Sequence, residues 1–298
     1  MPLYPWRKKT IEHIPDFLVV TWTDETAYER FPEFNWVYDK LEISKRFCPS
    51  LSIDLTNESP KKFPVIVKPK SKLLENQKVF LAKSQKDIDQ LEDKTGYIAQ
   101  QIIEGEHITG DYIVRDGKII DKVRFVCRRD ANHSFFLYER LPPSNFDLLE
   151  IVIKHIGFKF GIINFETVGG IILNIHLTPT IRVYDISNGF TEQLPHFIKT
   201  GEWTTVKYTP GYSRIYRRKI DAYPKLIKPL PEYPKGVTSV TLCFDEGKKL
   251  SDYYQDDQSF RYMIINGSNL SAIHNFASEV FECLEFKEVQ ESEKNHQE

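Results

Sequence analysis

Four polar side chains alternate along two short apolar strands that the sequence predicts between Gly161 and Thr180. In the segment GIINFETVGGIILNIHLTPT, Asn164 and Glu166 are two positions apart, and so are Asn174 and His176. Successive side chains of a strand point to opposite faces, so the two members of each pair share a face. A turn centred near Val168 and Gly169 places Asn164 opposite Asn174 in this prediction. The amide, carboxylate and imidazole groups on this face form either a solvated surface or the wall of a site.

The sequence lacks the motifs of several other kinds of functional site. The four cysteines have no CxxC or metal-type spacing, which argues against a zinc site and against a disulfide framework. No Ser-His-Asp or Cys-His arrangement is legible from the spacing, and the glycine fingerprint of nicotinamide enzymes is absent. The basic segment RIYRRK interleaves tyrosine with arginine, but the aromatic pattern of RNA-binding strands is missing.

The composition is that of an ordinary globular protein. The chain has 298 residues, of which 41% are hydrophobic and 28% charged, enough for a sizeable core and for two or three lobes. The net charge of −2 provides no general attraction to nucleic acid or to an anionic membrane. No apolar run is long enough for a signal peptide or approaches the ~20 residues of a membrane span. We therefore expect a cytoplasmic protein without nucleic-acid or membrane partners.

The elements that must position the polar face are a mixture of strands and helices. The opposite face of the hairpin carries Phe165, Leu173 and Ile175 and is expected to be core. Strands are predicted for KKFPVIVKPK and VFLAKS, a short helix for QKDIDQLEDK, and a hairpin with an Asp-Gly turn at RDGK. Antiparallel strands mixed with helices predict an α+β fold rather than a doubly wound parallel sheet.

Helical periodicity is clearest in the segment FDLLEIVIKHIGFKF. Its predicted apolar stripe consists of Leu148, Ile151, Val152 and Ile156, and Gly157 takes the C-cap position. From about residue 203 the sequence predicts short strands with many prolines, followed by a terminal helix in FASEVFECLEF.

Four separated segments, in this order, resemble the ATP-grasp superfamily. They are YDKL at Tyr38–Leu41, FPVIVKP at Phe63–Pro69, IAQQIIEGEHITGDYIVRDGKI at Ile98–Ile119, and INFETVGGIILNIHL at Ile163–Leu177. The resemblance implies an α+β fold in which two lobes clamp a nucleotide. It also implies a shortened N-terminal lobe at 1–60, nucleotide-binding lobes at 61–202, a β-rich C-terminal extension with a terminal helix at 203–286, and a tail at 287–298.

The resemblance implies roles for residues of the first three segments. Lys40 and Lys68 occupy the positions of the lysines that hold the ATP phosphates, where a compact cation offsets the phosphate charge. Gln100 stands where the family has a glutamate that contacts adenine, and an amide oxygen can still accept from the adenine amino group. The remaining residues implied at the adenine and the ribose are Gln101, Ile103, Glu104 and Glu106.

The fourth segment corresponds to the strands on which the family places its magnesium ligands. The resemblance implies that Asn164, Glu166, Asn174 and His176 line this metal wall, but only Glu166 carries a carboxylate. Magnesium prefers hard, charged oxygen ligands. The sequence therefore predicts a degenerate metal site, and it predicts that any ion bound there is softer, such as manganese or zinc.

The chain departs from the family pattern after Lys68 as well. The family has a glycine-rich phosphate loop, whereas this chain has KSKLLENQKVF, in which Lys70, Lys72 and Lys78 supply charge instead. An arginine such as Arg129 or Arg182 is implied for holding the acceptor carboxylate.

Two functions remain open from the sequence. One is a divergent, nucleotide-binding protein with weak or absent catalysis, or a non-catalytic scaffold. The other is an active ATP-dependent carboxylate–amine ligase, with ATP and Mg²⁺ as cofactors and a small-molecule or peptide carboxylate as the acceptor. Loss of metal carboxylates and of the glycine loop favours the first, while both lysines and the polar face favour the second. The weight of these features leans towards a degenerate member.

Overall fold

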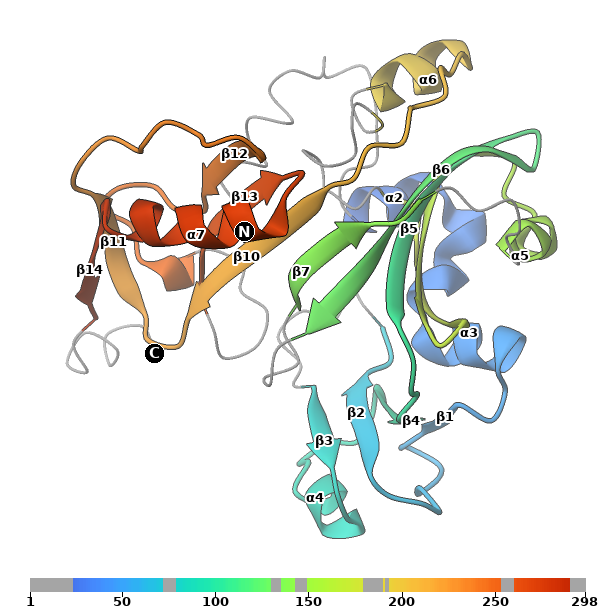
Figure 1. Cartoon of the computed structure of the whole chain (residues 1–298). Coiled ribbons are helices and arrows are strands. Elements are labelled where there is room, and N and C mark those ends of the chain that lie inside the picture. The colour runs from blue at the N-terminus through green and yellow to red at the C-terminus, as the bar shows by residue number, and fades with distance from the viewer. Residues whose placement is uncertain are drawn as a thin grey trace. The chain divides into compact units, whose positions relative to one another are not determined.

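The computed structural model describes residues 24–71, 79–129, 135–142, 149–178, 190, 193–252 and 260–289 (Figure 1). The described chain divides into two compact units, and the division falls within one long strand. The N-terminal unit contains residues 24–124 and 149–178, and the C-terminal unit contains the other described residues.

The N-terminal unit holds the segments that were singled out in the sequence. Its elements are α2 (Asp24–Arg30), the 3-10 helix η1 (Pro32–Tyr38), α3 (Lys40–Phe47), β1 (Ser52–Asp54), β2 (Val65–Pro69), β3 (Phe80–Ala82), α4 (Gln85–Asp89), β4 (Tyr97–Gln101), β5 (His107–Arg115), the first part of β6 (Lys118–Arg129), α5 (Leu149–Ile156), β8 (Phe160–Val168) and β9 (Ile171–His176).

The C-terminal unit consists mainly of antiparallel strands. Its elements are the rest of β6, β7 (Phe135–Arg140), α6 (Leu194–Thr200), β10 (Tyr212–Arg218), β11 (Ala222–Leu226), β12 (Val237–Leu242), the 3-10 helix η3 (Leu250–Asp252), β13 (Phe260–Gly267), α7 (Leu270–Phe281) and β14 (Leu284–Glu288). Strand β13 lies between β10 and β12, and β11 pairs with β14 in a separate two-stranded sheet.

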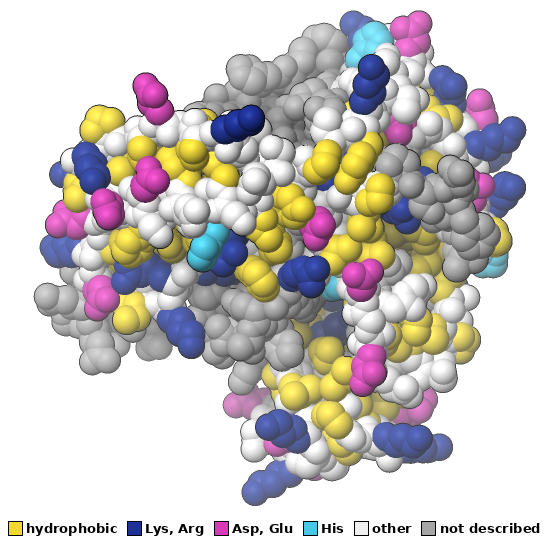
Figure 2. Space-filling model, in the orientation of Figure 1, with side chains coloured by type: hydrophobic (Ala, Val, Ile, Leu, Met, Phe, Trp, Pro, Cys, Tyr) yellow, Lys and Arg dark blue, Asp and Glu magenta, His cyan; other side chains and the backbone are white. Residues whose placement is uncertain are grey.

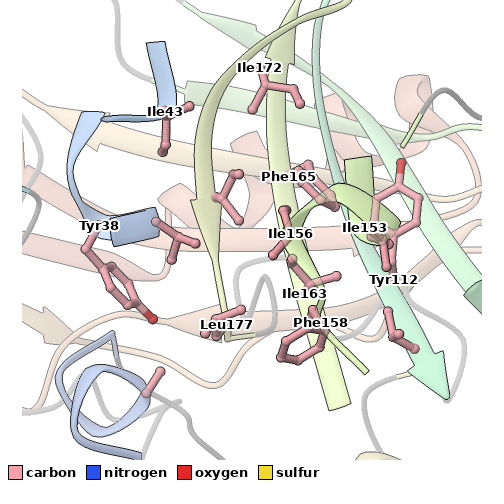
Figure 3. Packing of buried hydrophobic residues seen from close by; sticks show 14 residues of the cluster. Tyr38, Ile43, Tyr112, Ile153, Ile156, Phe158, Ile163, Phe165, Ile172 and Leu177 are labelled. Carbon is pink, nitrogen blue, oxygen red and sulfur yellow. The ribbon is translucent and has the colours of Figure 1, made fainter. Parts of the chain in front are cut away.

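The larger sheet of the N-terminal unit has one face covered by a hydrophobic core. Strand β8 pairs antiparallel with β5 on one side and with β9 on the other. Tyr112, Ile163 and Phe165 lie on the covered face, and α3 and η1 pack against β9 (Figure 3). Burying aromatic and branched side chains of this size stabilises a fold by about 1.5–3 kcal/mol each, so this core holds the sheet and its helices together.

The smaller sheet of the N-terminal unit has the order β1-β4-β2-β3, with all neighbours antiparallel. Its own core lies on one face, where Val65, Val67 and Ala99 pack with Ile88 of α4. Because side chains alternate along a strand, the intervening residues of β2 and β4 point to the other face. That other face carries the polar residues described below.

Local patterns in the sequence located most of these elements, with two corrections. The Asp-Gly hairpin is confirmed, since Asp116 and Gly117 have φ of 54° and 71°, and Gly157 has a φ of 79° just after α5. The stripe predicted for α5 is confirmed at Ile156 but was wrong at Ile151, which is 66% exposed, because Ile153 faces the core instead. Leu148 lies outside the described residues.

The terminal helix was also predicted too late in the chain. Helix α7 begins at Leu270, after the N-cap Asn269, and ends at Phe281, so the last part of the predicted helix forms β14. Asn269 explains the start, because its side chain accepts a hydrogen bond from the Ala272 N–H at 3.0 Å.

Charges are mixed on the molecular surface. On the face drawn in Figure 2, Lys and Arg side chains are interspersed with Asp and Glu side chains over the described residues. This distribution agrees with the net charge of −2. None of the helices in the described parts of the chain is long and apolar enough to cross a membrane.

We expect only one of the four cysteines to react quickly in the native protein. Cys48 is half-buried, whereas Cys127, Cys243 and Cys283 are buried. Burial raises the pKa of the Cys243 thiol to about 12, although the positive charges of Arg261 and Arg217 lower this pKa. The thiol therefore stays protonated at pH 8. A thiol reagent such as DTNB should therefore modify one cysteine in the native protein at pH 8, and four after unfolding in guanidinium. The Cys48→Ser variant should lose the fast phase, and two or more fast thiols would contradict this expectation.

Candidate functional site

A buried lysine and a buried glutamine share the face of the smaller sheet that lies opposite its core. The Cα partners are Lys68 with Ile98 and Gln100 with Ile66, which places these four residues on one face. Lys68 is 9% exposed and Gln100 is 4% exposed. Gln100 Nε2 donates to Ser52 Oγ at 3.5 Å across the β1–β4 pair. A lysine is rarely buried to this degree, so its position marks the end of β2 as a candidate site.

The second lysine reaches the same end of β2 from helix α3. The Lys40 backbone N–H donates to the Lys70 carbonyl oxygen at 2.9 Å, and Lys40 Nζ donates to the Pro69 carbonyl oxygen at 3.0 Å. Asp39 caps α3 by accepting from the backbone N–H of Leu41 at 2.8 Å. The helix start is therefore tied to the strand end, and Lys40 comes next to the segment that carries Lys68.

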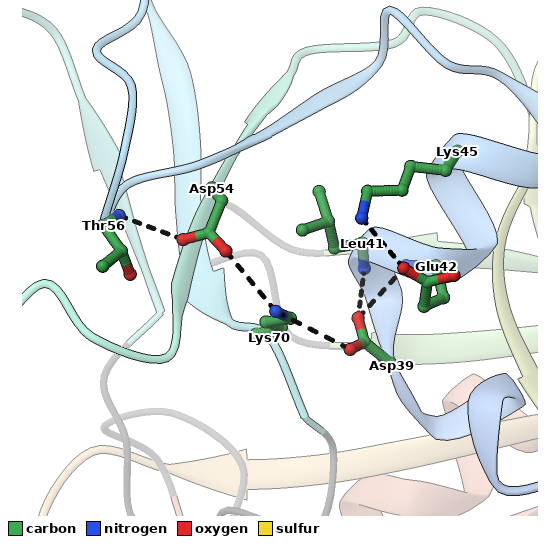
Figure 4. A network of polar contacts seen from close by, with 7 residues as sticks. All are labelled: Asp39, Leu41, Glu42, Lys45, Asp54, Thr56 and Lys70. Carbon is green, nitrogen blue, oxygen red and sulfur yellow. Dashed lines mark hydrogen bonds and ion pairs between the residues drawn. The ribbon is translucent and has the colours of Figure 1, made fainter.

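A network of acids holds the next lysine of the same segment (Figure 4). Lys70 Nζ lies 3.4 Å from Asp54 Oδ2 and 3.9 Å from Asp39 Oδ2. Although partial burial opposes ionisation, hydrogen bonds from Thr56 and the charge of Lys70 hold the pKa of Asp54 below its ordinary value. The charge of Lys70 is thus balanced within the structure, and its contacts tie the residue that follows β2 to β1 and to the N-cap of α3. Lys72 and Lys78 lie outside the described residues.

The residues predicted for the adenine and the ribose lie at the end of β4 and on the link between the two sheets. Strand β4 ends at Gln101, whose Nε2 donates to the Ser50 carbonyl oxygen at 3.1 Å, and β5 begins at His107. Ile103 is half-buried, and Glu104 and Glu106 are exposed. The link is therefore accessible except at Ile103, and it exposes the apolar side chain of Ile102 beside the two carboxylates, which suits recognition of a partly solvated ligand.

Two glycines hold this link against the β8–β9 turn. Gly169 donates its N–H to the Glu106 carbonyl oxygen at 3.1 Å. A Cβ added at Gly105 would lie 2.6 Å from the Gly169 Cα, and Gly105 has a φ of +129°. Only glycine tolerates both this backbone conformation and this approach.

The polar face of the β8–β9 hairpin exists, but its register differs from the prediction. Asn164 lies opposite His176 and Glu166 opposite Asn174, rather than Asn164 opposite Asn174. The two-residue turn at Gly169 and Gly170 would by itself put the two polar pairs on opposite faces. A register shift after Glu166 corrects this, since it leaves Leu173 as an extra residue in β9. For the same reason Leu173 is only half-buried and was wrongly assigned to the core.

Several side chains of this polar face form hydrogen bonds with one another. Asn174 Nδ2 donates to Glu166 Oε2 at 2.7 Å, and the same oxygen lies 4.0 Å from His107 Nε2. Asn164 Nδ2 donates to Asp111 Oδ1 at 2.8 Å and to Thr109 Oγ1 at 3.1 Å. Both Asn164 and Asp111 are buried.

Four residues of this face were missed in the sequence. His107, Thr109 and Asp111 of β5 lie at alternating positions, and Asp111 pairs with Asn164 in register. That alternation within HITGD was a signal that could have identified Asp111. The fourth is Asp24, whose Oδ1 lies 3.2 Å from His176 Nδ1. The sequence carries no signal for this pair, because 152 positions separate the two residues.

The donor set of this face fits magnesium poorly. Among the described residues no group of three or more His, Cys, Asp or Glu side chains is arranged to hold a metal ion. Glu166 Oε2 and Asp111 Oδ1 each accept from a neighbouring asparagine, so one oxygen of each carboxylate is already engaged. Magnesium is bound only through oxygen, whereas this face offers the two asparagine-bonded carboxylates of Glu166 and Asp111 and the imidazole of His176. The side chain of Arg129 and all of Arg182 lie outside the described part of the chain.

Comparison with known proteins identifies the fold. No protein-family model matches the sequence, and no curated protein matches it. Among solved structures, the L-amino acid ligase from Bacillus licheniformis has a TM-score of 0.66 at 12% identity, over 96% of this chain and 84% of that one. The biotin carboxylase domain of the Hydrogenobacter thermophilus 2-oxoglutarate carboxylase, crystallised with MgADP and bicarbonate, has a TM-score of 0.59 at 12% identity, over 86% and 68%.

A third neighbour extends the same comparison. The biotin carboxylase from Campylobacter jejuni, in complex with β-γ-ATP, has a TM-score of 0.53 at 13% identity, over 90% of this chain and 73% of that one. These neighbours are ATP-grasp proteins, in agreement with the resemblance of the four sequence segments. At these identities the likeness concerns the fold. This chain is therefore a divergent protein with the ATP-grasp fold.

Proposed function

We propose that this protein binds ATP or ADP through the end of β2, with little dependence on magnesium. The observation that carries the proposal is the presence of two lysines at the same strand end. Lys68 is 9% exposed at the end of β2, and the Lys40 ammonium donates to the adjoining Pro69 carbonyl oxygen at 3.0 Å. Two cations in a partly desolvated place attract a polyphosphate far more strongly than solvated lysines do.

The base and the ribose are assigned to the link that follows. Gln100 lies on the same face of the smaller sheet as Lys68, and the link from Gln101 to Glu106 leaves this sheet at the end of β4. In the proposed complex the Gln100 amide and the backbone around Ile103 contact adenine, and Glu104 or Glu106 accepts from the ribose hydroxyls. A nucleotide bound in this way extends from the link to the end of β2.

Catalysis is weak or absent in this proposal because the polar face of the β8–β9 hairpin has few carboxylates that could bind metal ions. ATP-dependent transfer relies on cations that bridge the β- and γ-phosphates and neutralise developing charge. Here the polar face offers Glu166, already hydrogen-bonded to Asn174, together with the imidazole of His176. The expected activity is therefore nucleotide binding, with turnover slow or missing.

One observation favours the alternative of an active carboxylate–amine ligase. The buried carboxylate of Asp111 lies on the strand next to Asn164 and Glu166, so the sheet carries more acid than the sequence indicated. In that reaction a carboxylate oxygen of a small-molecule or peptide acceptor attacks the γ-phosphorus, and ADP leaves. An amine then displaces phosphate from the acylphosphate, with Arg129 or Arg182 assigned to the acceptor carboxylate.

The proposal predicts that ADP stabilises the protein without magnesium. A ligand that binds only the native state stabilises it by about 2.7 kcal/mol at one hundred times its Kd, so millimolar ADP in EDTA should raise the Tm by several degrees. Adding magnesium should change this shift little. Differential scanning fluorimetry, followed by calorimetric titration, makes the measurement.

The other functions give different results in the same experiment. If ADP at millimolar concentration leaves the Tm unchanged with and without metal, the scaffold function replaces nucleotide binding. If the shift requires magnesium and ATP is hydrolysed when carboxylates and amines are supplied, the ligase function replaces the degenerate one.

A further inference from the structure

Strand β10 carries the basic segment RIYRRK, which the proposed nucleotide site does not use. The strand lies between β7 and β13 in the C-terminal unit (Figure 1). The β10–β13 pairing skips Tyr262 of β13, so the alternation of side chains along β10 itself is kept. Arg214, Tyr216 and Arg218 therefore share one face of β10, with the tyrosine between the two arginines.

The second of these arginines has partners within the protein. Arg218 Nη2 lies 3.3 Å from Glu288 Oε1, and Arg218 Nε donates to the Ile220 carbonyl oxygen at 2.9 Å. Its guanidinium carbon is also 4.5 Å from the centre of the Phe286 ring. The charge and several donors of Arg218 are thus engaged in holding the structure together.

The first arginine lies beside two aromatic rings instead. The Arg214 guanidinium carbon is 5.8 Å from the centre of the Phe136 ring and 5.4 Å from that of the Tyr216 ring. Arg214 is half-buried, and no described residue forms a hydrogen bond or an ion pair with it. Aromatic rings attract a cation through their faces, but they do not accept its in-plane N–H groups as a carboxylate does. These donors therefore remain available to an anion.

A bulge explains why Phe136 lies beside this arginine. The β6–β7 pairing skips Phe136, because Phe135 and Leu137 are opposite consecutive residues of β6. Leu137 lies opposite Arg214 in the pairing of β7 with β10. An extra residue in a strand redirects its side chain, and such bulges are common next to binding sites. The ring of Phe136 is thus brought towards the face that carries Arg214.

The Tyr216 hydroxyl is a second donor that lacks an acceptor. Its oxygen is buried and has no hydrogen-bond partner among the described residues. Burial raises the pKa of Tyr216 to about 12, although the charge of Arg214 lowers this pKa. The hydroxyl therefore keeps its proton at neutral pH and can donate it. An unpaired buried hydroxyl is unfavourable, so a bound group that accepts from it would stabilise this part of the structure.

We propose that Arg214 and Tyr216 bind the carboxylate of a small molecule beside Phe136. This site is separate from the proposed nucleotide site and does not depend on nucleotide binding. A guanidinium presents pairs of parallel N–H groups that match the two oxygens of a carboxylate. Its single charge balances one carboxylate, whereas a phosphomonoester carries about −1.5 to −2 charges at neutral pH. The half-buried guanidinium is the side from which the ligand enters.

The test is fluorine NMR of 4-fluorobenzoate mixed with the full chain in the absence of nucleotide. The ligand signal should broaden with wild type, and acetate should reverse the broadening more effectively than chloride at the same ionic strength. Neutral 4-fluorobenzamide should give no broadening. Arg214→Gln and Tyr216→Phe should each lower the affinity for 4-fluorobenzoate by about 10-fold or more, the factor expected for a hydrogen bond to a charged group.

Arg218→Gln is the matched control, because it removes an arginine from the same face of the same strand. Its charge is already paired with Glu288, so this variant should lower the Tm and leave the affinity within about twofold of wild type. Tyr216→Phe should behave in the opposite way. Its hydroxyl has no partner among the described residues, so its removal should leave the Tm unchanged or slightly higher while the ligand is lost.

Several results would overturn the inference. An unchanged affinity in Tyr216→Phe would do so even if Arg214→Gln folds poorly, and so would an equal loss in Arg218→Gln, which would indicate attraction by general charge. Displacement of 4-fluorobenzoate by inorganic phosphate at a lower concentration than acetate would contradict the assignment to a carboxylate. Absence of binding to wild type would overturn this site and leave the proposed nucleotide binding untouched.

Discussion

Replacing Lys68 with methionine is expected to weaken ADP binding by roughly 10- to 150-fold, because a hydrogen bond to a charged group contributes about 1.5–3 kcal/mol. Methionine keeps most of the volume of the lysine stem, so the 9% exposed position at the end of β2 stays filled. The loss then reports the ammonium group rather than a cavity. Calorimetric titration of ADP in EDTA measures the change without interference from metal.

The neighbouring lysine supplies a control on the same segment. Lys70 is two residues further along the chain, but its ammonium lies 3.4 Å from Asp54 and 3.9 Å from Asp39. Lys70→Met removes an equal charge from a place where two acids already neutralise it. Its effect should be a modest loss of stability with ADP affinity within about twofold of wild type, because partly exposed ion pairs contribute ~0–1 kcal/mol. Equal losses of ADP affinity in the two variants would show that general charge, and not the position of Lys68, attracts the nucleotide.

The location of Lys40 and Lys68 at the same strand end could be anticipated from the sequence, because each lysine belongs to a short segment with a recognisable local pattern. Lys68 is on a β-branched strand between prolines, and Lys40 is at the start of a helix whose N-cap is Asp39. Each element is specified locally, by strand propensity or by a capping side chain. Only their order along the chain, shared with a known superfamily, indicated that they meet at one place.

The polar hairpin shows where local reasoning is insufficient. Alternation correctly put Asn164 and Glu166 on one face, because a period of two depends on the strand alone. The pairing across the hairpin depends on where an extra residue is inserted, and nothing in IILNIH distinguishes Leu173 as that residue. A shift of one residue reverses every face, so the bulge has to be observed in the structure.

The contact between Asp24 and His176 was out of reach for a different reason. Neither residue belongs to a sequence pattern that predicts contact with the other. Only the tertiary structure brings Asp24 Oδ1 to 3.2 Å from His176 Nδ1. Asp111 is an intermediate case. Its alternation with Thr109 was a signal that could have indicated the face that it shares, but its burial and its hydrogen bond to Asn164 depend on the pairing of β5 with β8.

The second large effect is expected at Gly105, where alanine should destabilise the N-terminal unit by about 3 kcal/mol or more. A φ of +129° is unfavourable for any residue with a Cβ, and such strain costs ~1–3 kcal/mol. The added Cβ would also lie 2.6 Å from the Gly169 Cα and 2.9 Å from the Gly169 nitrogen, so the link or the turn has to move. Urea unfolding followed by circular dichroism measures the loss as a lower midpoint.

Gly170→Ala is the matched control, because it separates backbone strain from the close approach. Gly170 lies in the same turn and has a φ of +82°, but a Cβ there would meet no atom within 4 Å. Its replacement should therefore cost only the ~1–2 kcal/mol of a left-handed alanine. Equal losses of stability for the two variants would mean that the close contact between the link and the β8–β9 turn contributes little to stability. A larger loss for Gly105→Ala would show that the β8–β9 turn also fixes the link between Gln101 and Glu106. The polar face with Glu166 and His176 and the link proposed to contact adenine and ribose would then be held together by one backbone contact.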